Sequence, residues 1–265
     1  MQNDNLVNER RVLKERAVKE VNELVDGKYR IIQISIIGST GRGYNHEQSD
    51  LDVTAIYVLN KRQLCSLKPH PKHISNSNGS VRALEITHWM NQLVEYKPTA
   101  IELLIHGFTA EHTGFTNSIR GTVWEYLDKV RVTDAFAAMS RGMMYHPKIN
   151  LKDMVRAMYF YILAKFIHVN PMVLPPYEVS LLLSVRGLIP HREKFMKVFK
   201  LYSEGTESSS DIQIVNKIWG CEDFVKEVFI PLCEELMVGK DYVTDNEQLV
   251  NYLEMYLRVY VYKIS

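Results

Sequence analysis

The sequence predicts an α+β fold, in which a small mixed β-sheet near the N-terminus is followed by a mostly helical domain. Three segments rich in β-branched residues, at 30–37, 51–59 and 81–86, lie in the first third of the chain. Beyond them, apolar residues recur at helical spacing almost without interruption. We therefore expect a sheet-containing core over residues 1–110 and a helical domain over residues 111–265.

Helices are expected on both sides of these strands. Residues 5–27 carry apolar side chains at helical spacing, and Gly27 suits the end of a helix. Residues 61–80 contain two prolines and are expected to be a connection with little regular structure. The later helices are expected at 87–96, 98–107, 117–130, 133–146, 150–168, 177–186, 190–203, 211–219, 222–238 and 246–262.

The composition is that of an ordinary globular protein. The 265 residues are 46% apolar and 24% charged, and the net charge of +1 excludes a histone-like binder that coats nucleic acid. Three cysteines without a CxxC pair argue against a disulfide-stapled secreted domain or a Cys-rich zinc site. The N-terminus is polar, and the most apolar stretch, 157–164, is too short to span a bilayer. We therefore expect a cytoplasmic protein with no membrane partner.

The near-zero net charge hides an uneven distribution. Residues 141–200 carry 10 basic and 3 acidic side chains, whereas residues 201–265 carry 5 basic and 12 acidic ones. One interpretation is two solvated faces that pair with each other, and the other is a basic wall facing a polyanionic substrate. Lys152 and Arg156 are four residues apart on an expected helix and therefore share a face. They are candidates to hold a triphosphate or a polynucleotide backbone, and a solvated face is the alternative.

The segment that carries chemistry is 37–53, with the sequence IGSTGRGYNHEQSDLDV. Gly38 directly follows the first strand, where a residue without Cβ allows a sharp turn and a close approach to a phosphate. Ser39 adds a hydroxyl and a backbone N–H, and both can donate to phosphate oxygens. Arg42 adds a charged contact. A helical turn in this loop would favour the same anion through its free N–H groups.

Asp50 and Asp52 follow this loop at positions i and i+2. On a strand that spacing places both carboxylates on one face, where they repel each other unless a positive group lies between them. Hard oxygen ligands select Mg²⁺ or Mn²⁺. Each piece alone is also typical of a plain turn or a helix cap. Together they indicate metal-assisted phosphoryl or nucleotidyl transfer, although neither a Walker A loop nor a dinucleotide fingerprint is present.

These residues resemble a known signature. Gly38-Ser39, then Gly43, then Ser49-Asp50-Leu51-Asp52 is similar to the Gly-Ser and Asp-x-Asp pattern of the DNA polymerase β-type nucleotidyltransferase superfamily. The resemblance implies a nucleotidyltransferase core in residues 1–110. It also implies that Gly38 and Ser39 hold the β- and γ-phosphates, and that Arg42, Gly43 and Ser49 belong to the same nucleotide-binding loop.

A narrower resemblance runs further along the chain. Residues 84–105 and 151–167 resemble segments of the YcgL-like nucleotidyltransferases of the RNA-repair group, which occur in bacteria and large phages. Pro98 and the Ile-Glu-Leu-Leu run at 101–104 match the pattern of that group. Lys97 departs from it, since the group usually has Asn there.

The superfamily resemblance also implies a third carboxylate, because its members use three acidic side chains to hold two metals. Glu85, on the third expected strand, is the best candidate. The alternative is that Glu85 caps the helix that begins at Thr87. Glu102 is the runner-up, although its helical surroundings favour a structural role.

We therefore expect a nucleotidyltransferase that moves a nucleoside monophosphate from an NTP, with ATP expected, to an acceptor hydroxyl, for which an RNA end is a candidate. Asp50 and Asp52 would hold the first metal, Asp52 and Glu85 the second, and Glu85 would help to deprotonate the acceptor. The alternatives are nucleotidylation of a protein or small molecule, a nucleotide-binding regulator without catalysis, and a nucleic-acid-binding module that uses the basic wall. The intact Asp50 and Asp52 pair favours an enzyme.

Overall fold

The computed structural model describes residues 2–46, 49–105, 109–112, 114–146, 149–205, 211–237 and 246–261. These residues form a mixed α/β fold that divides into two compact units. The first unit comprises the described residues of 1–41, 50–126 and 244–265, and the second those of 42–49 and 127–243. The sheet-containing unit thus extends beyond the expected limit at residue 110 and includes the last helix of the chain. Within its described residues, the second unit contains helices but no strand.

The first unit is built on a five-stranded mixed sheet with the order β3-β4-β2-β1-β5. Its strands are β1 (Arg30–Ile37), β2 (Asp52–Val58), β3 (His73–Ser75), β4 (Val81–Glu85) and β5 (Thr109–His112). β1 runs antiparallel to β2 and β5, whereas β2 and β4 are parallel. The three expected strands are confirmed as β1, β2 and β4. The two edge strands, β3 and β5, are short, and their side chains have no run of alternating apolar residues that sequence reasoning could detect.

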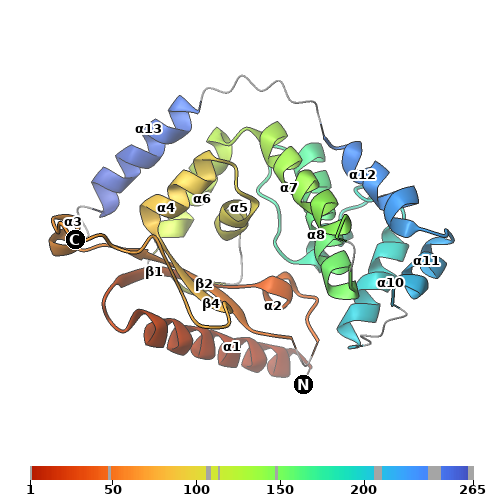
Figure 1. Ribbon diagram of the computed structural model, residues 1–265, viewed down its shortest axis with the longest axis horizontal. Coiled ribbons are helices and arrows are strands. Elements are labelled where there is room, and N and C mark those ends of the chain that lie inside the picture. Colours follow the sequence, from red (N-terminus) through yellow and green to blue (C-terminus); the bar gives the residue numbers. More distant parts are fainter. Residues whose placement is uncertain are drawn as a thin grey trace. The chain divides into compact units, whose positions relative to one another are not determined.

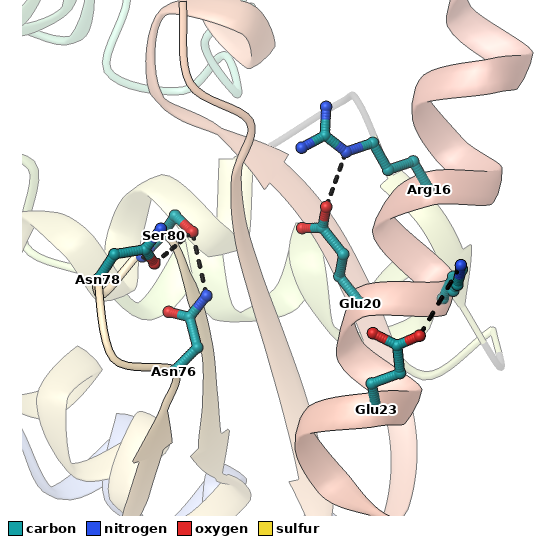
Figure 2. Close-up of polar contacts among 7 residues, drawn as sticks. Arg16, Glu20, Glu23, Asn76, Asn78 and Ser80 are labelled. Atoms are coloured by element: carbon teal, nitrogen blue, oxygen red, sulfur yellow. Dashed lines mark hydrogen bonds and ion pairs between the residues drawn. The ribbon is translucent and has the colours of Figure 1, made fainter.

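Helix α1 (Gln2–Val25) runs along one face of this sheet (Figure 1). Its buried residues Ala17, Val21 and Val25 pack in one cluster with the apolar side chains of β1, β2 and β4 that point to this face. The outer face of α1 is charged instead. Figure 2 shows the ion pair from Arg16 Nε to Glu20 Oε1 at 2.7 Å there. Such exposed pairs four residues apart contribute only about 0.3–0.5 kcal/mol each, so the apolar face accounts for the docking of α1.

Three helices cover the opposite face of the sheet: α4 (Ile86–Val94), α5 (Pro98–Ile105) and α6 (Phe115–Tyr126) (Figure 1). Gln33 on β1 donates from Nε2 to the carbonyl oxygen of Leu103 on α5 at 3.4 Å. This bond places α5 over the face to which Gln33 points. The sheet therefore has an apolar side under α1 and a side under α5 that contains polar groups.

The last helix of the chain, α13 (Glu247–Tyr256), belongs to this first unit, and the π-helical turn η2 (Leu257–Val261) follows it. Asn246, just before α13, accepts a hydrogen bond from the Tyr96 hydroxyl at 2.9 Å. The same side chain donates to the carbonyl oxygen of Val94 at the end of α4, at 3.2 Å. Asn246 therefore ties the start of α13 to residues about 150 positions earlier in the chain. This explains why α13 joins the N-terminal unit.

The turn before β4 is held by its own side chains. Ser80 Oγ donates to Asn78 Oδ1 at 2.8 Å, and Asn76 Nδ2 donates to Ser80 Oγ at 3.2 Å (Figure 2). The carbonyl oxygen of Ser80 accepts from the backbone N–H of Val53 on β2 at 2.8 Å. The parallel pairing of β4 with β2 therefore begins at Ser80, next to the start of β2. This local turn fixes the register of β4.

The connection at 61–80 also contains the short helix α3 (Lys61–Leu64), so it is more regular than expected.

The second unit is a helical assembly around α8 (Leu151–Val169), which is buried along most of its length. Its other helices are α7 (Lys129–Met144), α9 (Val179–Ser184), α10 (Arg192–Ser203), α11 (Asp211–Trp219) and α12 (Ile230–Glu234), with a π-helical turn η1 (Val225–Phe229) before α12. The helix expected at 222–238 is therefore divided. Pro231 lies in the first turn of α12 and has no N–H to donate, which accounts for the change of helix type. None of the described helices combines the length and the apolar character needed to cross a lipid bilayer.

Candidate functional site

The turn after β1 brings Gly38 against Asp52. A single helical turn, α2 (Gly38–Arg42), follows β1, and the backbone of Gly38 has φ +67°. Ile37 is paired with Asp52 across the β1–β2 ladder. A Cβ built on Gly38 would overlap the carboxylate of Asp52 and would stand 3.1 Å from its Cβ. Glycine is therefore required here twice, for its backbone conformation and for the room taken by the neighbouring carboxylate.

Asp50 and Asp52 have no partner among the described residues. Asp52 is the first residue of β2 and is partly buried, and Asp50 lies just before the strand and is exposed. Neither side chain makes a hydrogen bond or ion pair with a residue that the structure describes. Two such carboxylates repel each other, and their oxygens are the donors that Mg²⁺ prefers. The carboxylate of Asp52 lies against Gly38, and oxygen donors of this kind fit one divalent cation.

The structure does not bring Glu85, the expected third metal ligand, next to Asp50 and Asp52. Glu85 is paired with Tyr57 on β2, five positions beyond Asp52, or roughly 16 Å along the strand. Tyr57 points into the core under α1, and residues opposite each other share a face, so Glu85 also lies on the face away from Asp52. No three His, Cys, Asp or Glu side chains among the described residues lie close enough to hold a metal ion together.

Glu85 instead caps helix α4. Its Oε2 accepts hydrogen bonds from the backbone N–H groups of Thr87 at 2.9 Å and His88 at 3.1 Å, and from the Thr87 hydroxyl. These N–H groups have no partner within the helix, and a carboxylate there also interacts favourably with the helix dipole. The buried carboxylate of Glu85 is thus satisfied by the helix that it begins.

A row of polar residues crosses the sheet on the face of Asp52. Ser35 on β1 is opposite Thr54 on β2, and Thr54 is opposite Arg82 on β4. Arg82 Nε donates to Thr54 Oγ1 at 2.8 Å, and Gln33 Nε2 donates to Ser35 Oγ at 2.6 Å. Gln33, Ser35 and Thr54 are buried. The residue of β4 that lies opposite Thr54 on this face is therefore the cation Arg82 and not a carboxylate.

Glu102, the runner-up for the third carboxylate, is also buried. It is 4% exposed and lies on α5, the helix that Gln33 ties to this face. It forms no metal-ligand group with Asp50 and Asp52, because no such group of three exists among the described residues.

Arg42, expected to contact a phosphate, is packed against aromatic side chains of the second unit. Its side chain is 3% exposed. The guanidinium carbon lies 4.8 Å from the ring centre of Tyr159 and 4.9 Å from that of Phe160, both on α8. Its Nη1 also donates to the Tyr44 hydroxyl at 3.1 Å. Cation–π contacts of this kind stabilise the packing of Arg42 inside the second unit.

The other two loop residues, Gly43 and Ser49, also belong to the second unit. Gly43 has φ +77°, so the backbone again requires glycine, and a Cβ there would make only ordinary contact with Glu178. Ser49 Oγ accepts from the backbone N–H of His46 at 3.0 Å and so closes a local turn. Glu47 and Gln48 lie outside the described residues. The expected nucleotide loop is thus divided: Gly38 and Ser39 lie in the unit of Asp52, and the rest in the other unit.

Lys152 and Arg156 lie in the first two turns of α8, in the second unit. Lys152 is exposed, and Arg156 is half-buried with its guanidinium carbon 5.9 Å from the ring centre of Phe160. Arg156 Nε is buried without a hydrogen-bond partner, and neither side chain forms an ion pair with a described residue. The shared face predicted from the spacing therefore carries two cations that no described acid neutralises.

Sequence reasoning missed Arg82. In the sequence, Val-Arg-Ala-Leu-Glu at 81–85 alternates, and the alternation correctly puts Arg82 and Glu85 on opposite faces. It does not say which face Asp52 shares, because that depends on the register between β2 and β4.

No known protein family, no curated protein and no solved structure matches this chain.

Proposed function

We propose that this chain is a metal-dependent nucleotidyltransferase that moves a nucleoside monophosphate from an NTP to an acceptor hydroxyl. The observation that carries the proposal is the close approach of Gly38 to the carboxylate of Asp52, which has no partner among the described residues. A turn that only reverses the chain has no need to hold a carboxylate against a glycine. Here the close approach leaves the carboxylate of Asp52 next to the backbone of a helical turn, and we propose that a metal–triphosphate is held there.

The residues of the first unit divide the work of binding. Ser39, partly exposed at the start of α2, offers its hydroxyl and N–H to phosphate oxygens. Asp50 and Asp52 would hold a divalent cation, Mg²⁺ or Mn²⁺, through carboxylate oxygens. When bound, such a cation neutralises phosphate charge and polarises the phosphorus–oxygen bonds of the triphosphate. Lys152 and Arg156 lie in the second unit, and a phosphate contact from them stays a prediction from the sequence.

The transfer itself is an in-line displacement. The acceptor hydroxyl oxygen bonds to the α-phosphorus, and the bond from that phosphorus to the oxygen bridging to the β-phosphate breaks. Its electron pair leaves with pyrophosphate, and the hydroxyl proton passes to solvent water. The chain's own contribution is to position the triphosphate and to complement its charge, which supplies most of the catalysis in reactions of this class. No side chain of β4 is needed as a base in this scheme.

A second candidate function is nucleotide binding without transfer. It is favoured by one observation, the position of Glu85, because the described residues then offer two carboxylates rather than three at this site. A site of that kind could hold a metal–nucleotide complex as a regulatory ligand. The two functions share the same residues and differ only in whether pyrophosphate is released.

The experiment is incubation of the chain with ATP labelled on the α-phosphate and Mg²⁺, with and without a short RNA that ends in a free 3′-hydroxyl. We expect release of pyrophosphate and label on the RNA. Asp52→Asn keeps the shape of the side chain but removes its charge, and it is expected to lower the rate about 100-fold or more. Asp26→Asn is the matched control, since Asp26 is an exposed carboxylate of the same unit whose partner is the exposed Lys28.

The position of the label separates the alternatives. Label on the chain itself or on an added protein indicates nucleotidylation of protein. Mg²⁺-dependent ATP binding that is lost in Asp52→Asn, without pyrophosphate release, indicates the regulator. Full activity of Asp52→Asn, or no binding of ATP by the unmodified chain, would falsify the proposed site.

A further inference from the structure

A surface pocket lies between helices α6 and α13, which are neighbours within the first unit (Figure 1). Its volume is about 430 Å³, and pockets that bind small organic molecules measure roughly 300–1,000 Å³. Four of its lining residues are spaced at i, i+3, i+4 and i+7 on α13 and therefore share one face of that helix. The residues that line it are Tyr126, Gln248, Asn251, Tyr252 and Met255.

The helix that carries most of the pocket is anchored at both of its ends. Just before α13, Asn246 donates to the last residue of α4, and at the end of α13 the Tyr256 hydroxyl shares a hydrogen bond with the Ser118 hydroxyl of α6. Between these anchors, Leu249 and Leu253 are buried on the adjoining face of α13. The walls of the pocket are therefore held in place by the packing of the unit.

The lining combines exposed apolar surface with free hydrogen-bonding groups. The rings of Tyr126 and Tyr252 lie 5.4 Å apart, centre to centre, and are inclined by 42°. Tyr126 is 42% exposed and Met255 is 51% exposed, which is unusual for large apolar side chains. The amides of Gln248 and Asn251 and the two phenol hydroxyls make no hydrogen bond with a residue that the structure describes. No lining residue carries a charge.

We propose that this pocket binds a nucleobase, presented by a free nucleoside or by single-stranded RNA. The flat face of a base can stack on an exposed tyrosine ring, and the two rings contact each other, so the base lies on their outer side and not between them. The amides of Gln248 and Asn251 offer both donors and acceptors, which match the donors and acceptors along the edge of a base.

The uncharged lining is the reason to assign the base and not another part of a nucleotide. A phosphate would find no cation in the lining, and a ribose would find few hydrogen-bonding groups for its hydroxyls. None of the lining residues belongs to β2 or to the turn after β1. The proposal is therefore independent of the metal site, and it applies whether or not the chain transfers nucleotides.

The test measures equilibrium dialysis of the full chain against labelled adenosine, ribose or a short oligoadenylate RNA, with EDTA present to remove metal ions. Adenosine or the RNA is expected to bind, and ribose is not. Tyr126→Ala is expected to weaken binding about 10-fold or more, because the stacking surface is lost. Asn251→Ala is expected to weaken it about 2- to 10-fold. Tyr252→Phe keeps the ring and should lose less than Tyr126→Ala.

The matched control is Tyr145→Ala, the same change at an exposed tyrosine outside the pocket, and Asp52→Asn is a second control. Both should bind as the unmodified chain does, and melting temperatures show that each variant is folded. Loss of adenosine binding in Tyr126→Ala identifies a free nucleoside as a ligand, whereas loss of RNA binding alone identifies RNA. The proposal is overturned if ribose binds as tightly as adenosine, if neither adenosine nor RNA binds, or if Tyr126→Ala and Asn251→Ala keep full affinity. None of these results bears on pyrophosphate release at Asp52.

Discussion

Gly38 and Asp52 occupy the same small space at the end of the β1–β2 ladder, so that the carboxylate of one residue fills the position that a Cβ would take on the other. The positive φ of Gly38 turns the chain away from the sheet at that point. Asp52 therefore lies directly beside the first peptide groups of α2. The two residues are separated by 13 positions in the sequence, yet each determines what the other can be.

We expect Gly38→Ala to destabilise the protein more than Gly27→Ala does. Both glycines have positive φ, +67° and +64°, so both variants pay about 1–2 kcal/mol for a left-handed alanine. Only at Gly38 does the new methyl group meet another atom, since nothing lies within 4 Å of a Cβ at Gly27. Urea unfolding of the two variants measures the difference. Equal losses of unfolding free energy would show that the carboxylate of Asp52 moves aside without cost.

We expect Glu85→Ala to lower stability by about 1 kcal/mol, because it removes the cap of α4, and to leave nucleotide affinity unchanged. Glu85→Gln keeps an acceptor oxygen and should lose less stability. The measurements are thermal unfolding and binding of an ATP analogue with Mg²⁺. A Glu85→Gln variant with normal stability and weakened nucleotide binding would restore Glu85 as a metal ligand.

The basic pair on α8 is expected to contribute to RNA binding through charge. Lys152→Glu combined with Arg156→Glu should weaken binding of a single-stranded RNA and flatten the slope of log affinity against log salt by roughly 1–2, because two phosphate contacts are lost. Binding is measured at several salt concentrations.

The matched control for that pair is Lys61→Glu combined with Arg62→Glu, which makes the same charge change at exposed residues of α3. This double variant should leave the slope as in the unmodified chain. An unchanged slope in the α8 variant would mean that Lys152 and Arg156 form only a solvated face.

A pH dependence is expected from the buried thiol of Cys233. Burial raises its pKa from the usual 9.0 to about 11, and a hydrogen bond with Ser140 opposes this only in part. The folded state therefore keeps the neutral thiol while the unfolded chain ionises. The resulting stabilisation is fully present below pH 9 and is lost as the pH rises toward 11, by about 2 kcal/mol at pH 10.5.

Urea unfolding of the unmodified chain and of Cys233→Ala between pH 8 and 10.5 checks this expectation. The buried phenols of Tyr57 and Tyr161, whose pKa values burial also raises, are present in both proteins and cancel in the comparison. The free energy of unfolding should fall less steeply with pH in Cys233→Ala. Parallel pH profiles would place the thiol in contact with water.

The local pattern was sufficient for most elements of the fold. The strand expected at 30–37 matches β1 residue for residue, and those at 51–59 and 81–86 match β2 and β4 to within one residue at either end. Short-range sterics and the alternation of apolar side chains determine such elements, and both are visible in the residues themselves. The edge strands β3 and β5 escaped prediction because their stability comes from backbone pairing with a neighbour, to which side-chain type adds little.

For the candidate site, too, the local sequence predicts some features and only the tertiary structure decides the others. Gly38, Ser39, Asp50 and Asp52 are recognisable in the sequence because they lie on either side of one turn, and their spacing alone brings them to one end of the β1–β2 ladder. Which carboxylate or cation faces them from β4 is a matter of register, and a shift of a single residue exchanges the two faces of a strand. The turn at Ser80 sets that register through hydrogen bonds among Asn76, Asn78 and Ser80. Only the tertiary structure therefore decides that Arg82, rather than Glu85, shares the face of Asp52.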